Sequence, residues 1–367
     1  MSEVTQTSDD TLMAEALTLA VRGRGATSPN PMVGALVTQR GHVVGRGYHA
    51  RAGGRHAEVV ALDEAGDAAT GGRLYCTLEP CCHTGRTGPC VERIVQAGLA
   101  AVVVGVEDPD PRASGAGIRY LRERGISVTV GVREAEAIRL NEAFFTVQRL
   151  ARPFVTMKVA LSLDGKIAVA PGERTQLTGR EVSVHAHGVR GIVDAIAVGS
   201  ETVVVDDPLL TARGGAERQR PLVRVVFDTR MRTPPTARLF GTLDAGPVVI
   251  VTTEAGLARW PERAGFLERA GAVVEVLPVR DPAVALSRLL AHDVSDLLLE
   301  GGALLHQSMW SAGLVDRVRL YLAPVVLGET GVSWMQPGQA SIAKLGGSAP
   351  RWLGRDLLLE TDVQRVD

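Results

Sequence analysis

The chain has 367 residues, of which 45% are hydrophobic and 22% are charged, and its formal net charge is −1. A chain of this length usually forms two domains, and its apolar content is sufficient for well-buried cores. The near-zero charge and the aromatic share of 4% argue against a surface for nucleic acid. No apolar run reaches the roughly 18–20 residues of a membrane span, so we expect neither nucleic-acid nor membrane partners.

The N-terminal segment MSEVTQTSDD is polar and acidic and lacks the basic and apolar regions of a secretory signal. We therefore predict a mobile tail over residues 1–9 of a cytoplasmic protein. All four cysteines lie within residues 76–90. Such clustering in a reducing compartment is more typical of a metal or catalytic site than of a disulfide framework.

Helical and strand patterns alternate through the first half of the chain. Apolar residues at helical spacing predict a helix near the N-terminus, capped by Asp9 or Asp10. A β-hairpin is predicted at residues 32–48, and the helices and strands after it are, in chain order, HAEVVALDEAG, GGRLYCTLEP, PCVERIVQAG, AAVVVGVEDP, GAGIRYLRERG, ISVTVGV and EAEAIRLNEAFFTVQRL. This order predicts a mostly parallel sheet covered by helices on both faces.

A domain boundary is predicted where Arg152-Pro153 interrupts the last of these helices. The first domain then spans residues 10–150, and the second, also α/β, spans 151–367. Strand and helix patterns alternate again in FVTMKVAL, REVSVHAHGVRGI, VDAIAVGSETV, PLVRVVFD, GPVVIVTT, AVVEVLPV, AVALSRLLAHD, DLLLEGGALLHQSMWSAG and RVRLYLAPVVLG. Exposed loops are expected at ARGGAERQR and QPGQASIAKLGGSAP.

Two cysteines are the best candidates for metal ligands. Cys81 follows a predicted strand, and Cys90 opens a predicted helix, where the dipole and the free amides stabilise a thiolate. Cys76 lies inside the strand, where we expect it to pack in the sheet, and Cys82 falls in the loop. Because catalytic zinc usually takes three protein ligands and leaves one position open, a third ligand is needed, and His56 at the start of a helix is the candidate.

Glu58 lies two residues after His56 and completes a recognised combination. Zinc lowers the pKa of bound water toward ~7, and a free carboxylate beside it can shuttle the proton. His-x-Glu followed by Pro-Cys and a second cysteine is typical of zinc nucleobase deaminases, although the spacer between Cys81 and Cys90 is longer than usual here. Two alternatives remain, a closed structural zinc site that includes His83 and a metal-free group of buried thiols.

Several segments resemble one family, the bifunctional deaminase–reductase of bacterial riboflavin biosynthesis. These segments are SPNPMVGALV, HAEVVAL, TLEPCCHTGRTGPC, KVALSLDGKIA and DDPLLTAR, and they occur in family order. The resemblance implies an N-terminal cytidine-deaminase-like three-layer α/β/α domain followed by a dihydrofolate-reductase-like α/β domain. Gly88-Pro89 stands where the family usually has Pro-Pro, which loosens the turn before Cys90.

For the first domain, the resemblance implies deamination by zinc hydroxide. The substrate would be 2,5-diamino-6-(5-phosphoribosylamino)pyrimidin-4(3H)-one and the product 5-amino-6-(5-phosphoribosylamino)uracil. It implies His56, Cys81 and Cys90 as ligands and Glu58 as the proton shuttle. It also implies substrate contacts from Asn30, His49 and Arg86. Asn30 can read a pyrimidine edge and Arg86 can meet the 5-phosphate. The alternatives for the three residues are a turn at Asn30-Pro31, a surface histidine and a solvated loop charge.

The second half has no GxGxxG motif and would be difficult to assign by itself. A Gly-Gly pair between a predicted strand and helix can bring backbone amides to a phosphate, although a simple packing turn explains the same pair. The resemblance implies reduction of the ribosyl group to ribityl by NADPH, with cofactor contacts from Ala160, Thr202, Asp206, Thr229, Gly301 and Gly302. It implies substrate contacts from Arg190, Leu210, Arg213 and Glu300. Lys158 is our candidate for polarising the opened ribose or handling its proton, and a structural salt bridge is the alternative.

Two positions in GERTQLT depart from the family pattern. Arg174 replaces a substrate-contacting serine, and Gln176 replaces a cofactor-side tryptophan. No motif distinguishes NADPH from NADH, and the expected homo-oligomer could be a dimer or a tetramer. Two rival functions are a nucleoside- or tRNA-type zinc deaminase with an accessory nucleotide-binding domain, and a zinc-stabilised NADPH sensor without turnover. Glu58 argues against the sensor, because a structural zinc site needs no free acid.

Overall fold

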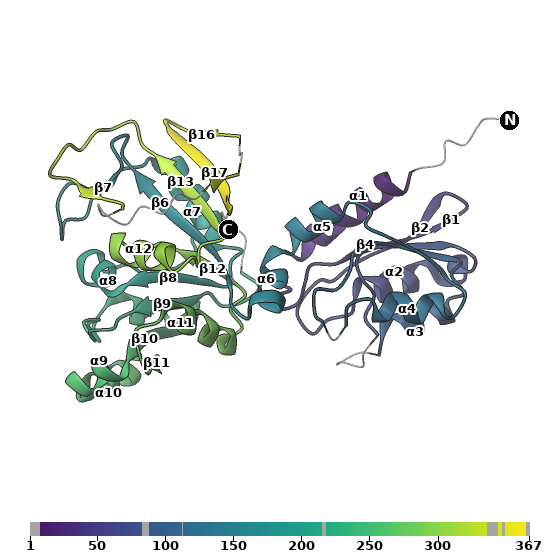
Figure 1. The fold of residues 1–367 in the computed structure, drawn as a ribbon, viewed down its shortest axis with the longest axis horizontal. Coiled ribbons are helices and arrows are strands. Elements are labelled where there is room, and N and C mark those ends of the chain that lie inside the picture. The colour runs from purple at the N-terminus through teal and green to yellow at the C-terminus, as the bar shows by residue number, and fades with distance from the viewer. Residues whose placement is uncertain are drawn as a thin grey trace. The chain divides into compact units, whose positions relative to one another are not determined.

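The computed structural model describes residues 8–82, 88–111, 113–214, 218–335, 344–346 and 349–364. The chain divides into two compact units, Met1–Ala151 and Arg152–Asp367 (Figure 1). Residues 1–7 of the expected tail, and also His83 and Arg86, lie outside the described residues. Within the described ranges, no helix has the length and apolar character needed to cross a membrane.

The first unit is built on a five-stranded sheet in the order β2-β1-β3-β4-β5. The strands are β1 (Gly34–Gln39), β2 (His42–Tyr48), β3 (Arg73–Leu78), β4 (Ala101–Val106) and β5 (Ser127–Val130). β2, β3, β4 and β5 run in one direction, and β1 pairs antiparallel with both of its neighbours, β2 and β3. Four of the five strands therefore share one direction, as expected for a mostly parallel sheet, and β1 is the exception. β1 runs against them because the tight turn at Arg40-Gly41, where both residues have positive φ, joins it directly to β2 as the predicted hairpin.

Helices cover both faces of this sheet and make three layers (Figure 1). On one side lie α1 (Asp9–Ala20) and α5 (Glu134–Leu140), and on the other lie α2 (Ala57–Ala65), α3 (Cys90–Gln96) and α4 (Ala116–Arg122). Short 3₁₀ turns follow α1 and α2 at η1 (Val21–Gly23) and η2 (Gly66–Ala69). The buried core draws on both helix layers and on consecutive residues of the strands, such as Ala35, Leu36 and Val37, because both faces of the sheet are covered.

The long helix predicted after β5 is in fact two helices, α5 and α6 (Glu142–Leu150). Asn141 separates them, with φ −115° and ψ 24°. Its buried side-chain amide donates to the Met32 carbonyl at 2.9 Å and accepts from the Met32 N–H at 2.7 Å. This local pairing with a distant loop competes with helix continuation, which helical periodicity alone does not reveal.

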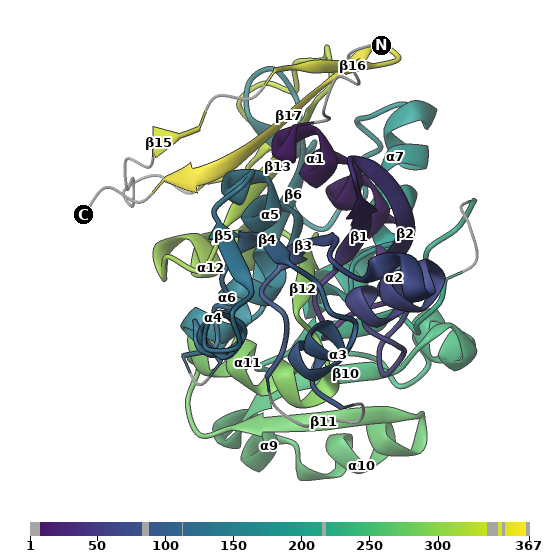
Figure 2. The same cartoon turned by 90° about the vertical axis from the view of Figure 1, so that its right-hand side faces the viewer.

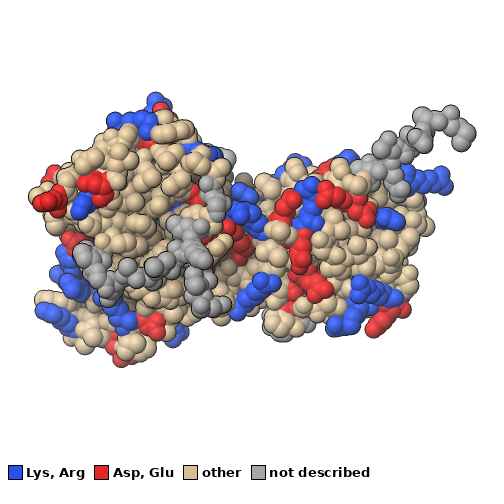
Figure 3. Space-filling view, turned by 45° about the horizontal axis from the view of Figure 1, so that its top comes forward, with Lys and Arg blue, Asp and Glu red and all other residues tan. Residues whose placement is uncertain are grey.

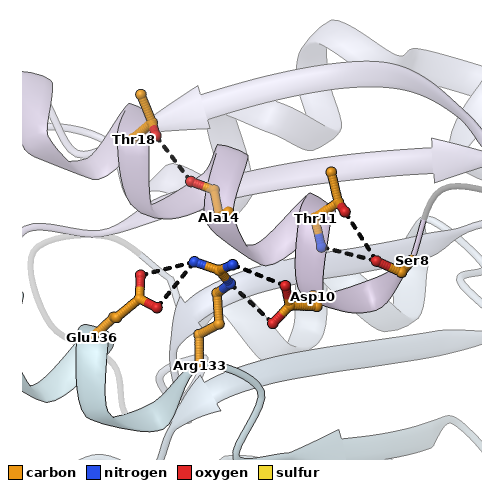
Figure 4. Close-up of polar contacts among 7 residues, drawn as sticks. All are labelled: Ser8, Asp10, Thr11, Ala14, Thr18, Arg133 and Glu136. Carbon is orange, nitrogen blue, oxygen red and sulfur yellow. Dashed lines mark hydrogen bonds and ion pairs between the residues drawn. The ribbon is translucent and has the colours of Figure 1, made fainter.

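The cap of α1 also differs from the prediction. Ser8, and neither Asp9 nor Asp10, caps the helix, because its hydroxyl accepts the N–H three residues later (Figure 4). Asp10 instead pairs with both ends of the Arg133 guanidinium at 2.8 and 3.0 Å, and Arg133 also holds Glu136 (Figure 4). This set of contacts connects α1 to the start of α5.

The second unit contains a ten-stranded sheet whose main path is β11-β10-β9-β8-β12-β6-β13-β17-β15. Seven of its strands are mutually parallel: β6 (Phe154–Leu161), β8 (Ala195–Gly199), β9 (Val223–Phe227), β10 (Val248–Thr253), β11 (Ala272–Leu277), β12 (Asp296–Leu299) and β13 (Arg317–Leu322). In Figure 2, β17 (yellow) lies near one edge of this sheet, and β11 lies at the opposite edge. A separate pair consists of β7 (Lys166–Ala168) and β14 (Val332–Ser333).

Both faces of this sheet are covered, so its strands carry apolar residues on both sides. Ala195 and Ala197 of β8 contribute to one core, with α11 (Pro282–Leu289) and α12 (Ala303–Ser311). Ile196 of the same strand faces the opposite core. The helices with residues in this opposite core are α7 (Arg180–Arg190), α8 (Ser200–Asp206) and α10 (Pro261–Arg269).

Several elements of the second unit were not predicted. They are the strand pair β7 and β14, α9 (Glu254–Arg259), α10, the 3₁₀ turn η3 (Arg238–Ala245), and the C-terminal strands β15 (Lys344–Leu345), β16 (Arg351–Leu353) and β17 (Asp356–Gln364). The predicted segment AVALSRLLAHD forms α11 and ends in a 3₁₀ turn, η4 (Leu290–His292). β17 extends the sheet antiparallel to β13. Most of the expected loop QPGQASIAKLGGSAP lies outside the described residues, but its Lys344–Leu345 pairs with β17.

Charge is mixed over the surface. On the face drawn in Figure 3, acidic and basic side chains are interspersed on both units, which gives no support for a nucleic-acid surface there. The expected loop ARGGAERQR is exposed at Arg213 and Gly214 but half-buried at Arg218 and Arg220. There Arg220 pairs with Asp194 at 2.6 Å, and Arg218 donates to the Val193 carbonyl at 2.9 Å.

Candidate active sites

Three side chains from separate segments meet in the first unit. His56 is the N-cap of α2, Cys81 follows β3, and Cys90 is the first residue of α3. His56 Nδ1 lies 3.2 Å from Cys90 Sγ and 3.5 Å from Cys81 Sγ, and the three ligand atoms lie within 4.8 Å of one another. Tetrahedral zinc with bonds of about 2.3 Å to sulfur and 2.0–2.1 Å to nitrogen implies N···S separations of about 3.5 Å. The donor set and its spacing therefore fit zinc.

The start of α3 also prepares Cys81 for a metal. The Cys90 backbone N–H donates to Cys81 Sγ at 3.4 Å, as expected at a helix N-terminus. Hydrogen bonding from the Cys90 side chain, supported by His56, outweighs burial and lowers the pKa of Cys81 to about 4. A thiolate is the form that binds metal. Cys76 is fully buried in β3, where burial raises its pKa, so it packs in the sheet as predicted.

Glu58 lies in the first turn of α2, beside this group of ligands. Its side chain is 4% exposed and lines the same cavity as His56 and Cys81. Burial, and then the neighbouring Cys81, raises the pKa of Glu58. The first turn of the helix thus brings His56 and Glu58 to one cavity, although they would face apart in mid-helix.

Asn30 and His49 form a polar pair on the wall of the same cavity. His49 Nδ1 lies 3.0 Å from the Arg55 carbonyl, and His49 Nε2 lies 3.3 Å from Asn30 Nδ2. Because a carbonyl only accepts, Nδ1 carries the hydrogen and Nε2 accepts from the amide, which turns the Asn30 carbonyl oxygen outward as an acceptor site. At 3% exposure, His49 is not a surface residue. Burial also lowers its pKa, consistent with a neutral ring.

Sequence reasoning missed several residues that line this cavity: Glu79, Asp108, Asp110, Phe144 and Gln148. Asp108 and Asp110 follow β4, which is the parallel neighbour of β3. The carboxyl ends of adjacent parallel strands form one edge, where ligands bind in α/β proteins. The segment VEDPDP, which follows a predicted strand, therefore contained the sequence signal for these two carboxylates. Nothing in the sequence pattern of α6 indicates that Phe144 and Gln148 face the cavity.

Glu79 has a positioning role that is visible in its hydrogen bonds. One carboxylate oxygen accepts the N–H groups of Asp108 and Gly115 at 3.1 and 2.9 Å. The other accepts those of Gly117 and Ile118 at 2.9 and 3.1 Å. The side chain is only 5% exposed. Glu79 therefore holds the β4–α4 loop, which carries Asp108 into the cavity, against the end of β3, which carries Cys81.

In the second unit, Glu300 is the centre of a buried charged group. Arg190 donates to both of its carboxylate oxygens at 2.7 and 2.8 Å, and Lys158 Nζ lies 3.8 Å away. Burial alone would raise the pKa of Glu300, but Arg190 and Lys158 hold it at about 2. Arg190 also donates to the Thr211 carbonyl at 3.2 Å. Three of its five donors are therefore occupied, and two of them position Glu300.

Lys158 and Ala160 point to the same side of β6, because they are two residues apart. Tyr321 lies opposite Ala160 in β13, and the Lys158 ammonium lies 5.8 Å from the centre of its ring. His306 of α12 is also close, since burial and then Lys158 lower its pKa to about 4. Lys158 is half-buried and makes one long ion-pair contact, with Glu300. It therefore has a partly structural role, and part of its side chain remains accessible to solvent.

The Gly301-Gly302 turn fits a dinucleotide phosphate. A Cβ at Gly301 would lie 2.7 Å from the Gly199 nitrogen, so the close approach to β8 requires glycine. Gly302 is the N-cap of α12, and no side chain caps this end of the helix. N–H groups in the first turn of α12 therefore remain available to a ligand. Thr202 Oγ1 would lie 3.9 Å from a Cβ at Gly302, which places its hydroxyl at the same turn.

The remaining expected residues of this half are spread around that turn. Asp206 is the last residue of α8, and its partial burial raises its pKa. The charge of Arg174 acts in the opposite direction and lowers this pKa. The atypical Arg174 therefore lies near an expected cofactor residue. Leu210 is buried with φ 54°, and Arg213 is exposed. The other two positions are Thr229, in the wall of a second cavity, and Gln176, exposed and bonded to the Thr178 carbonyl.

Comparison with known proteins identifies both halves. A model of the cytidine and deoxycytidylate deaminase zinc-binding region matches residues 6–106, and a model of the RibD C-terminal domain matches residues 153–352. The riboflavin biosynthesis protein RibD of Aquifex aeolicus is 40% identical over 96% of this chain and 97% of its own length. The chain belongs to the RibD family.

Solved RibD structures agree over nearly the whole chain. RibD of Acinetobacter baumannii has a TM-score of 0.87 at 32% identity, covering 97% of this chain and 99% of its own. The diaminohydroxyphosphoribosylaminopyrimidine deaminase/5-amino-6-(5-phosphoribosylamino)uracil reductase of Thermotoga maritima has a TM-score of 0.82 at 31% identity, with the same coverage. The expected fold class, a deaminase domain followed by a reductase domain, is confirmed.

As a RibD protein, the chain is an enzyme of riboflavin biosynthesis with two activities, a hydrolytic deaminase and a reductase. Zinc and NADPH are the cofactors of the two halves. The matched zinc-binding region includes His56, Cys81 and Cys90, and the matched reductase region includes Lys158 and Glu300. Membership of this family favours neither a tRNA-directed deaminase nor a sensor without turnover.

Proposed function

We propose that the first unit converts 2,5-diamino-6-(5-phosphoribosylamino)pyrimidin-4(3H)-one to 5-amino-6-(5-phosphoribosylamino)uracil, and that the second reduces the ribosyl group of this product to ribityl with NADPH. The observation that carries the proposal is the meeting of His56, Cys81 and Cys90, with the buried Glu58 lining the same cavity. A structural zinc site has no use for such a carboxylate.

In the first unit, His56, Cys81 and Cys90 would hold the metal. Zinc, when bound there, supplies the Lewis acidity that makes water nucleophilic near neutral pH. Glu58 accepts a proton from the attacking water and passes it to the departing amino group. A carbon–oxygen bond forms, the carbon–nitrogen bond breaks, and ammonia leaves.

Substrate recognition in this cavity begins with two polar residues. The Asn30 carbonyl oxygen, fixed by the hydrogen bond from its amide to His49, is an acceptor for the pyrimidine edge. His49 is itself held by the Arg55 carbonyl, so the pair is oriented before the substrate arrives. Arg86, outside the described residues, is our candidate for the 5-phosphate, because a guanidinium pairs with phosphate through two donors.

In the second unit, NADPH supplies a hydride for the sugar C1 when bound. Lys158 polarises the opened ribose and supplies the proton that balances the hydride. Glu300 holds Lys158 in place through their ion-pair contact, and Arg190 orients Glu300. The small side chain of Ala160, on the same side of β6 as Lys158, leaves room for the reacting rings. We propose Thr202, Asp206, Thr229, Gly301 and Gly302 as the other cofactor contacts, and Leu210 and Arg213 as further substrate contacts.

The test is to incubate the purified chain with the diaminopyrimidine ribotide, with and without NADPH, and to follow ammonia, both pyrimidine products and NADPH. We expect ammonia without NADPH, and the ribityl product only with it. In the Glu58→Gln variant, ammonia release should fall at least 10²-fold, as for loss of a general acid–base group. Zinc content, and reduction of the added uracil intermediate, should remain.

Glu64→Gln is the matched control, because Glu64 is an exposed carboxylate of the same helix. It should deaminate at the wild-type rate. Normal deamination by Glu58→Gln, or deamination of tRNA in place of the ribotide by the wild type, would contradict the proposal.

Three coarser expectations complete this proposal. We assign the deaminase to residues 10–150 and the reductase to 151–367. We infer a homo-oligomer, a dimer or a tetramer, which light scattering on the purified chain would test. We also infer a cytoplasmic location from the four free cysteines, which fractionation of cells would test.

A further inference from the structure

The parallel strands of the second unit place its residues in a defined order along one edge. β6, β12, β8, β9, β10 and β11 lie side by side in that order. With strands about 4.8 Å apart, the carboxyl end of β9 lies about 14 Å from that of β6, and the end of β11 about 24 Å. Lys158 and Ala160 lie on β6, and the Gly301-Gly302 turn follows β12. A dinucleotide with its reactive ring at β6 and its pyrophosphate at this turn therefore extends toward β9–β11.

A cavity lies at that far end, and arginines from two separate loops line it. Arg230 and Arg232 come from the loop after β9, and Arg280 comes from the loop after β11. All three side chains are exposed at the surface. Thr229, one of the expected cofactor residues, lines the same cavity. The cavity therefore belongs to the side of the site farthest from Lys158.

The acidic residues of this cavity are already engaged. Glu201 forms an ion pair with Arg232. Asp281 caps α11 and accepts the N–H groups of the second and third residues after it, at 2.8 and 3.3 Å. In contrast, Arg230 and Arg280 make no ion pair or side-chain hydrogen bond with another described residue. The cavity thus offers two uncommitted guanidinium groups to a ligand.

NADPH differs from NADH only by a phosphate on the 2′-oxygen of the adenosine ribose. We propose that Arg230 and Arg280 bind this 2′-phosphate and make the second unit selective for NADPH. A guanidinium presents paired donors that match phosphate oxygens, and no motif of the dinucleotide-binding type is present to supply the selectivity. The inference rests on the proposed function of the second unit as a reductase.

The test measures binding by calorimetry with the full chain, so that it does not depend on turnover. The ligands are NADPH, NADH, 2′,5′-ADP and 5′-AMP, and the variants are Arg230→Ser and Arg280→Ser. Each variant should weaken NADPH and 2′,5′-ADP about ten- to hundredfold, as expected for lost hydrogen bonds to a charged group. NADH and 5′-AMP should change less than twofold. Added salt should weaken 2′,5′-ADP more than 5′-AMP in the wild type.

Arg288→Ser is the matched control, because Arg288 is exposed on α11 but does not line the cavity. It should bind all four ligands as the wild type does. Equal loss of NADPH and NADH affinity in the variants would place the arginines at the pyrophosphate and overturn the inference, and so would unchanged NADPH affinity. A wild type that binds neither dinucleotide would instead remove the proposed reductase itself.

Discussion

The strongest single test of the first unit is the change Glu79→Gln. An amide keeps one acceptor oxygen and replaces the other by a donor. Two of the four backbone N–H groups that Glu79 now accepts would therefore face an NH₂ group. Each buried donor left unsatisfied costs about 1–3 kcal/mol, so the closed loop would lose about 2–6 kcal/mol. Because folded domains are stable by about 5–15 kcal/mol and loops open at a lower free-energy cost than whole domains unfold, we expect the loop to open before the unit unfolds.

Hydrogen exchange of residues 107–118 would measure this opening directly. The deaminase KM should rise at least tenfold, because the loop carries Asp108 and Asp110 of the cavity wall. Zinc content and the reductase rate, measured on the same chain, should not change. Asp10→Asn is the matched control, since it breaks the exposed contacts with Arg133 in Figure 4 on another part of the unit. Wild-type exchange and KM in Glu79→Gln would refute the positioning role.

Three further changes test other parts of the molecule. His306 is buried, and its pKa is about 4, below the ordinary 6.5. As pH falls below about 6.5, this imidazole takes up a proton in the unfolded chain but not in the folded one. The folded state therefore loses stability as pH falls from about 6.5 toward 4. Urea unfolding of the second unit should lose about 2 kcal/mol between pH 7 and pH 5 from this group, and His306→Leu should remove that part of the slope. Removal of zinc by a chelator should abolish ammonia release and leave NADPH oxidation with the uracil intermediate intact; parallel loss of both activities would contradict separate sites. Gly301→Ala should abolish NADPH binding in calorimetry, because its Cβ would lie 2.7 Å from the Gly199 nitrogen, and normal binding would show that the turn can widen.

The grouping of His56, Cys81 and Cys90 was predictable from sequence because each of these residues sits at a junction that the sequence marks. Cys81 follows an apolar strand, Cys90 follows Gly88-Pro89 and opens a helix, and His56 follows two glycines. Strand ends and helix starts are local features, and local features are what one sequence reveals. The structure brings these three junctions together as expected.

What the sequence did not reveal depends on contacts between distant segments. Asn141 divides a helix because its amide pairs with Met32, which lies 109 positions away. β17 joins the sheet through its pairing with β13, after a stretch rich in glycine and serine that carries no strand pattern. The four donors to Glu79 lie up to 39 positions further along the chain. The hydrophobic periodicity of a segment does not reveal which distant segment it pairs with, because each segment alone is compatible with more than one structure.

The two candidate active sites share one structural feature in spite of their different chemistry. In the first unit, Glu79, Cys81, Asp108 and Asp110 of the cavity follow the parallel strands β3 and β4, and in the second, cavity residues follow β12, β8, β9 and β11. At this edge, each strand ends in a turn whose amides are not used by the sheet, and a helix often begins directly after it. In the function that we propose, a cysteine in such a turn holds the metal, and a glycine pair binds a phosphate. The chemistry therefore depends on which residue stands in the turn, while the sheet positions the turn. One chain can for this reason carry a hydrolase and a reductase on similar layers of strands and helices.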